Sequence, residues 1–179
     1  STVPANTGVT LNNNQNNTVI SGTRYDDSIY NFASNVTINA GAGNDTIENR
    51  SVYNSINGGG GNDVIKLSTG KGMLTVIGGK GDDTIFGNGG TDRVIQYNSG
   101  DGNDVIIDFT SGDTFQIFGA PYSTQQSGSD VIISVGSGSI TLKDGSGKDL
   151  DIYGTLESGS SNGVTITNRT SNTLLGGTK

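Results

Sequence analysis

Aliphatic residues recur along the first half of the chain at a spacing that suits stacked coils of two short strands each. They form two series, one of Ile29, Ile47, Ile65 and Ile85 and one of Ile20, Ile38, Ile56 and Val76. Small polar residues such as Thr37, Ser55 and Thr75 precede members of the second series. Because side chains alternate between the two faces of a strand, each aliphatic residue would point inward. The pattern predicts two parallel sheets around a narrow interior, with about 18 residues per coil.

Glycine-rich segments that contain Asp connect these predicted strands. Six of them follow the pattern G-G-x-G-x-D-x-apolar, with Asp at positions 27, 45, 63, 83, 92 and 104. The alternate half-coils, near residues 30–35, 49–54 and 68–72, lack this pattern. We therefore predict that acidic turns stack along one side of the coil, the acidic edge, and that Asn- and Ser-rich turns form the second edge. The exception is the segment ending at Asp92, which falls on the second edge, where we expect Asp113 to stack against it.

Composition agrees with a thin core and narrows the possible functions. Glycine supplies 30 of 179 residues and hydrophobic residues only 30%, against about 45–50% in typical domains. The absence of Cys and His excludes thiol nucleophiles, His-based triads and zinc clusters. The net charge of -7 disfavours nucleic-acid binding. No apolar run approaches the roughly 18 residues of a membrane span, so membrane insertion is not expected.

The stacked acidic repeats resemble the nonapeptides of RTX proteins, which form calcium-binding parallel β-helices. The resemblance covers residues 18–118, with departures at Thr23, Tyr25, Ala40, Asn88 and Ser99. It implies an all-β fold, a right-handed β-roll of stacked 18-residue coils, which binds several calcium ions between successive turns. The alternative from the residues alone is a metal-free β-helix in which Asp serves as a turn former.

The resemblance also implies a set of calcium ligands. Carboxylates on the acidic edge would be Asp27, Asp45, Asp63, Asp83 and Asp104. Carbonyl oxygens would come from Gly22, Arg24, Gly41, Gly43, Gly58, Gly60, Gly78 and Lys80. Five turns leave four gaps, so about four ions would fill this edge. A further site on the second edge would use Asp92 with Asp108 or Asp113.

The remaining chain divides into a lead-in, a cap and a second repeat. We predict a lead-in at residues 1–17, the roll at 18–118 and a C-terminal β cap at 119–162. Residues 8–24 align without gaps to residues 163–179, with eight of seventeen pairs identical. We therefore expect residues 163–179 to begin the next unit of a tandem array, in which the chain is monomeric.

These features predict a calcium-binding module of a secreted or surface-attached bacterial protein, a structural or adhesive repeat that is not an enzyme. The RTX resemblance implies type I secretion and folding on calcium outside the cell. The alternative is a glycan-binding or accessory roll attached to a secreted enzyme or toxin, with Tyr30, Tyr53 and Tyr97 as a sugar-stacking surface. Catalysis by the chain itself is disfavoured by the lack of His and the scattered basic residues.

Overall fold

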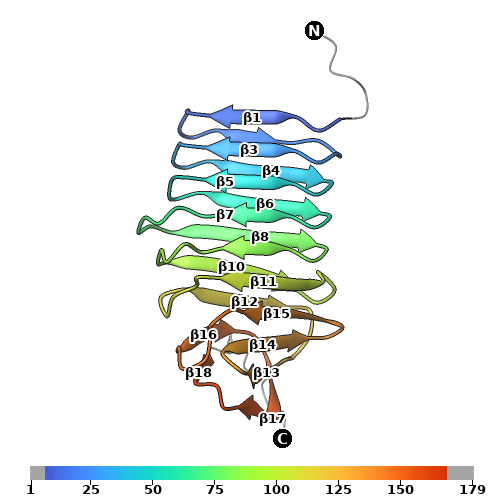
Figure 1. Ribbon diagram of the computed structural model, residues 1–179, viewed down its shortest axis with the longest axis vertical. Coiled ribbons are helices and arrows are strands. Elements are labelled where there is room, and N and C mark those ends of the chain that lie inside the picture. Colours follow the sequence, from blue (N-terminus) through green and yellow to red (C-terminus); the bar gives the residue numbers. More distant parts are fainter. Residues whose placement is uncertain (1–6, 169–179) are drawn as a thin grey trace, which may run out of the picture.

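The fold is a column of stacked β-coils, seen in a computed structural model that describes residues 7–168 (Figure 1). These residues form strands and turns, and none of them lies in a helix that could cross a membrane. Ten strands make one sheet, here sheet A: β1 (Thr10–Asn13), β3 (Ser28–Asn31), β5 (Thr46–Asn49), β7 (Val64–Lys66), β9 (Thr84–Phe86), β11 (Asn103–Ile107), β13 (Tyr122–Ser127), β14 (Asp130–Val135), β15 (Gly138–Leu142) and β17 (Leu156–Asn162). Eight make sheet B: β2 (Val19–Ser21), β4 (Thr37–Ala42), β6 (Ser55–Gly60), β8 (Leu74–Lys80), β10 (Arg93–Asn98), β12 (Thr114–Phe118), β16 (Leu150–Tyr153) and β18 (Ile166–Asn168).

The chain crosses from one sheet to the other after each strand from β1 to β12, which winds it into coils. Every neighbouring pair among β1 to β12 is parallel. Turns that follow sheet B strands form the acidic edge, and turns that follow sheet A strands form the second edge. The predicted all-β parallel roll is confirmed.

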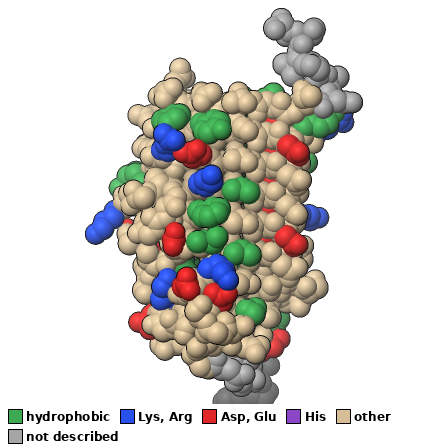
Figure 2. Space-filling model, viewed as in Figure 1, with side chains coloured by type: hydrophobic (Ala, Val, Ile, Leu, Met, Phe, Trp, Pro, Cys, Tyr) green, Lys and Arg blue, Asp and Glu red, His purple; other side chains and the backbone are tan. Residues whose placement is uncertain are grey.

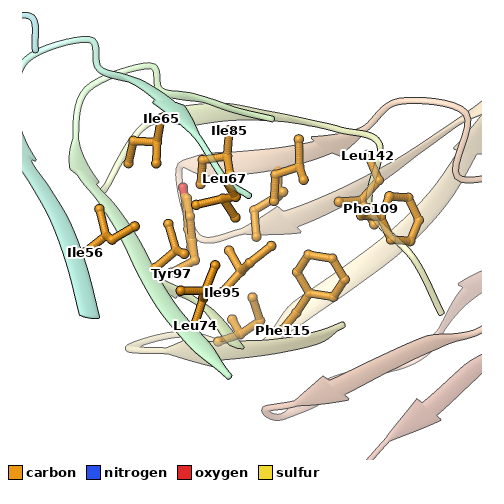
Figure 3. Packing of buried hydrophobic residues seen from close by; sticks show 14 of the residues in the cluster. Ile56, Ile65, Leu67, Leu74, Ile85, Ile95, Tyr97, Phe109, Phe115 and Leu142 are labelled. Carbon is orange, nitrogen blue, oxygen red and sulfur yellow. The ribbon is translucent and has the colours of Figure 1, made fainter. Parts of the chain in front are cut away.

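Both aliphatic columns fall in register and face the space between the sheets (Figure 3). In sheet A, Ile29 pairs with Ile47, Ile47 with Ile65 and Ile65 with Ile85. In sheet B the series Ile20, Ile38, Ile56 and Val76 is likewise in register. The columns continue beyond the repeats, through Ile106 and Leu142 in sheet A and through Ile95, Phe115 and Ile152 in sheet B. One buried aliphatic residue per short strand explains how so few hydrophobic residues fill the core.

Asparagine side chains form a ladder inside the second edge. Asn13 Nδ2 donates to Asn31 Oδ1, and Asn31 Nδ2 donates to Asn49 Oδ1, both at 2.8 Å. Asn54 Nδ2 also donates to Asn49 Oδ1, at 2.8 Å. Asn31, Asn49 and Asn54 are buried, so this ladder satisfies amides that would be costly to bury alone. The second edge is therefore held by neutral side chains in its first coils.

The regular winding changes after β12. Strands β13, β14 and β15 enter sheet A between β11 and β17, and β14 runs antiparallel to both β13 and β15. β15 then pairs in parallel with β11, and β16, β17 and β18 resume the alternation between sheets. Residues 119–162, predicted as a cap, thus include a three-stranded insertion into one sheet and a return to coil winding.

We predict that Ile56→Ala destabilises the roll by about 2–5 kcal/mol, because it removes a fully buried side chain from a core one residue thick. Urea unfolding in saturating calcium measures the loss. The neighbouring Ser55→Ala is the control, since Ser55 is exposed on the same strand and should change stability by less than about 0.5 kcal/mol. Equal effects of the two substitutions would contradict the assignment of the inner face.

Candidate metal centre

A ladder of carboxylates runs along the acidic edge, one residue per coil. The backbone amide of Asp27 donates to Asp45 Oδ1 at 2.7 Å, and the amide of Asp45 donates to Asp63 Oδ1 at 2.7 Å. The same contact joins Asp63 to Asp83 at 2.8 Å and Asp83 to Asp104 at 3.1 Å. All five side chains are at most 5% exposed. The coil winding therefore brings together the five acidic-edge carboxylates that the repeats predict, and each amide fixes the orientation of the next carboxylate.

The second oxygen of three of these carboxylates is left without a protein donor. Oδ2 of Asp45, of Asp63 and of Asp83 is buried and has no hydrogen-bond partner among the described residues. A buried carboxylate oxygen in this state is costly unless a cation compensates it. In these three turns the ladder thus leaves one carboxylate oxygen free to bind a positive ion.

Burial shifts the protonation of these groups. Desolvation raises the pKa of Asp45 to about 6 and that of Asp63 to about 7. The amide of the preceding coil opposes this rise, and the neighbouring carboxylates add to it. Desolvation likewise raises the pKa of Asp83 to about 6 and that of Asp104 to about 8. In the absence of a cation, the folded edge therefore favours protonated carboxyls.

Glycine keeps space open beside the free oxygens. A Cβ on Gly58 would lie 2.3 Å from Asp63 Oδ2 and 2.5 Å from the carbonyl oxygen of Gly78. A Cβ on Gly78 would lie 2.2 Å from Asp83 Oδ2. A carboxylate oxygen of one coil and a carbonyl oxygen of the next thus approach each other at these glycines. Such hard oxygen donors suit calcium, which binds six to eight oxygens, so the residues present fit this ion.

The carbonyls predicted as ligands fall into different columns. Gly22, Gly58 and Gly78 share one column, in which the register places Ala40 rather than Gly41. Gly41 instead pairs with Gly59. Gly43 stacks in the same way against Gly61, since a Cβ on Gly61 would lie 2.1 Å from the Gly43 carbonyl oxygen. Gly41 and Gly43 are therefore displaced by one residue from the carbonyls predicted in the neighbouring coils. That their carbonyls bind calcium stays a prediction.

Three further predicted carbonyl positions lie in the same turns. The Gly60 carbonyl accepts from the Gly43 amide, and the Lys80 carbonyl accepts from the Gly61 amide, both at 2.8 Å. Arg24 lies in the first acidic turn with an exposed side chain. Within residues 7–168, no three acidic, His or Cys side chains cluster as a metal site. Backbone carbonyls would therefore supply most of the ligands in each gap.

A second ladder on the outside of the acidic edge escaped the sequence analysis. Asp26 Oδ1 accepts from the Asn44 amide at 2.6 Å, and Asn44 Oδ1 accepts from the Asn62 amide at 2.7 Å. The series continues through Asp82 to the Asn103 amide. Its signal in the sequence was the Asp or Asn that directly precedes the ladder Asp in each turn. The outer ladder thus adds a second series of hydrogen bonds between successive acidic turns, made by exposed side chains.

The second edge has a different charge arrangement from the one predicted. Asp113 lies opposite Arg93, not Asp92, because its Oδ1 accepts from the Arg93 amide at 3.0 Å. Its Oδ2 accepts from the Thr110 amide at 2.8 Å. The expected stacking of Asp113 on Asp92 was wrong by one residue, since the register here is 20 residues and not 21. Asp92 and Asp108 both have positive φ, 67° and 58°.

The Arg93 guanidinium fills the interior of this edge. Arg93 is 1% exposed. Its Nη1 donates to the carbonyls of Thr91 at 2.7 Å, Gly70 at 3.1 Å and Gly72 at 3.4 Å, and its Nη2 donates to the Ser68 carbonyl. A Cβ on Gly90 would lie 1.6 Å from Nη2, so any larger residue there would displace the guanidinium. A fixed cation thus binds carbonyls of two successive turns. This arrangement favours Arg93 over a metal ion, and a metal site of Asp92, Asp108 and Asp113 stays a prediction.

A comparison with protein families agrees with the repeats described above. The family model of the RTX calcium-binding nonapeptide repeat (4 copies) matches residues 33–49, 53–73 and 75–95. Members of this repeat family bind calcium ions. No curated protein matches the chain. Among solved structures, the extracellular lipase LipA from Serratia marcescens aligns at 14% identity and a TM-score of 0.37, over 75% of this chain and 36% of the lipase chain.

We predict that acid partly replaces calcium. The folded pKa values of Asp45, Asp63, Asp83 and Asp104 lie above the ordinary 3.8, so the folded state binds protons more tightly than the unfolded state. That stabilisation is complete below about pH 4 and is lost as the pH rises through about 6 to 8. In metal-free buffer, circular dichroism should therefore show more β-structure at pH 5 than at pH 8. Greater metal-free stability at pH 8 would contradict this reasoning.

We predict that Arg93→Met destabilises the roll by about 3–5 kcal/mol, because it removes a buried charge with its partners left in place. Four carbonyl oxygens would lose their donor. Arg50→Met is the matched control, since Arg50 pairs with Glu48 on the surface and such pairs contribute about 0–1 kcal/mol. Urea unfolding in saturating calcium measures both. Similar losses for the two variants would mean that Arg93 does not hold the second edge.

Proposed function

We propose that this chain, which carries RTX calcium-binding nonapeptide repeats over residues 33–95, is a structural module that folds when calcium binds outside the cell. The observation that carries the proposal is the buried, unpaired Oδ2 of Asp45, Asp63 and Asp83. Their carboxylates stand one coil apart, about 4.8 Å for adjacent strands. Bound calcium would supply the positive charge that these oxygens lack and would link successive turns.

The composition of the chain makes its folding depend strongly on calcium binding. The core has one aliphatic residue per short strand, which gives little hydrophobic stabilisation against the chain entropy of the glycine-rich turns. Without a cation, the stacked carboxylates also repel one another and resist burial. Ion binding to the folded edge alone then becomes folding free energy. Calcium is about millimolar outside cells and scarce in the cytosol, so folding would follow export. The proposal therefore includes export of the unfolded chain from a bacterium by type I secretion.

A spacer or adhesive role in a tandem array suits the shape and surface better than catalysis. On the face in Figure 2, Lys and Arg side chains are interspersed with Asp and Glu side chains among a majority of uncharged ones. The aromatic surface proposed for sugar stacking is incomplete, because Tyr97 is 1% exposed and its hydroxyl donates to the Gly102 carbonyl. Tyr53 is 57% exposed, but it cannot form one surface with Tyr97, because Tyr97 is buried in the core. We therefore place glycan binding second to the structural role.

We predict that Asp83→Asn lowers the calcium affinity at least tenfold, while Asp82→Asn leaves it nearly unchanged. Asparagine at position 83 keeps an Oδ1 that can accept from the Asp63 amide, but replaces the unpaired Oδ2 by an NH2 group. Asp82 is exposed, and the same charge change there keeps its contact with the Asn103 amide. Calcium titration followed by circular dichroism measures both variants.

Two outcomes would contradict the proposal. A wild-type chain that is fully folded in excess chelator, with a spectrum unchanged by calcium, would show that folding does not depend on the ion. Equal affinity losses in Asp82→Asn and Asp83→Asn would show that only net charge matters and that the inner ladder is not the binding site.

A further inference from the structure

The strands at the two ends of the column share a sequence. Residues 8–13 and residues 163–168 match at four of six positions, including Asn13 and Asn168. β1 comes from the first segment and β18 from the second. Leu11 in β1 and Ile166 in β18 occupy equivalent positions in the match, and both are partly buried against the core. The two segments thus have an inward-facing aliphatic residue at the same position and stand at opposite ends of the roll.

These equivalent strands nevertheless belong to different sheets. β1 is the end strand of sheet A, and β18 is the end strand of sheet B, paired in parallel with β16. The eighteen strands have seventeen connections, of which two, from β13 to β14 and from β14 to β15, stay within sheet A. The fifteen others cross between the sheets, and an odd number of crossings places the end of the unit half a coil away from its start.

We infer that the open end of the column at β18 is covered by a second copy of the chain. This copy is stacked end to end on the first and is turned by half a coil. β18 would serve as the β1 of the next copy, so that the next sheet A continues this sheet B. This inference rests on the tandem array proposed above and specifies its geometry. The acidic edge of one copy would then be followed, on the same side, by the asparagine-rich second edge of the next.

The direction of the chain at β18 supports this arrangement. β18 runs parallel to β16, toward the side on which sheet B strands enter the acidic turns. The sequence match continues from Asn168 to Lys179, opposite the turn and strand at residues 14–24. That turn lies on the second edge in this copy. The open ends would be covered as well, since an unpaired strand edge otherwise invites unspecific pairing.

A two-copy fusion tests the half-coil turn. Asn168 of the first copy is joined directly to Asn14 of the second, so that residues 163–168 replace the second β1. The chain has no cysteine, so paired Cys residues can carry spin labels without background. Thr155→Cys in the first copy marks the acidic side next to β18. Asn14→Cys or Arg24→Cys in the second copy marks its second edge or its acidic edge. All three positions are exposed.

In saturating calcium, we expect the distance from position 155 to position 14 to be shorter than that to position 24. The difference should be about 20 Å, the width of a sheet of about six residues at about 3.3 Å per residue. A control fusion joined after Lys179 by a flexible Gly-Ser linker should give broad distributions. Equal, reversed or broad distances in the direct fusion would overturn the inference. So would failure of the direct fusion to fold where the single chain folds with calcium. Circular dichroism of the single chain tests the proposed function separately. A single chain whose spectrum does not change with calcium would refute that function.

Discussion

Stacked burial of like charges is the constraint on which this fold depends. Coiling places Asp27, Asp45, Asp63, Asp83 and Asp104 in one column and removes each from water. Backbone amides satisfy one oxygen of each carboxylate, and this contact orders the turns. Burial makes the remaining oxygen costly, because no protein donor reaches it at Asp45, Asp63 or Asp83 within the described chain. A bound cation, as proposed above, would balance this charge.

The second edge meets the same requirement by other means. Its first coils use neutral asparagine amides, which donate and accept along the stack. Where glycine-rich turns expose carbonyl oxygens instead, the Arg93 guanidinium binds four of them. The second edge thus contains its own donors, while the acidic edge leaves carboxylate oxygens without one. The proposed dependence on calcium would therefore belong to one edge rather than to the whole coil.

The sequence predicts what is periodic and misses what occurs once. The aliphatic columns and the ladder Asp residues repeat at nearly constant spacing, so register follows directly from counting. The one-residue error at Asp113 arose where the coil length changes from 21 to 20 residues, which counting alone cannot resolve. The burial of Arg93 and Tyr97 gave no signal because a single charged or aromatic residue is usually exposed, and only the packing reveals it. The sequence predicts a β cap at residues 119–162, but the place of β13 to β15 within sheet A depends on pairings far apart in sequence.

That insertion makes the two sheets unequal in height. Sheet A has ten strands and sheet B eight, so at about 4.8 Å per strand one wall of the column is taller by about 10 Å. A single unit is therefore a wedge, and copies stacked in one orientation would build an arc. With the half-coil turn, the tall wall of each copy continues the short wall of the one before it. The excess then alternates from side to side and cancels over each pair, so that wedge-shaped units can build a straight rod.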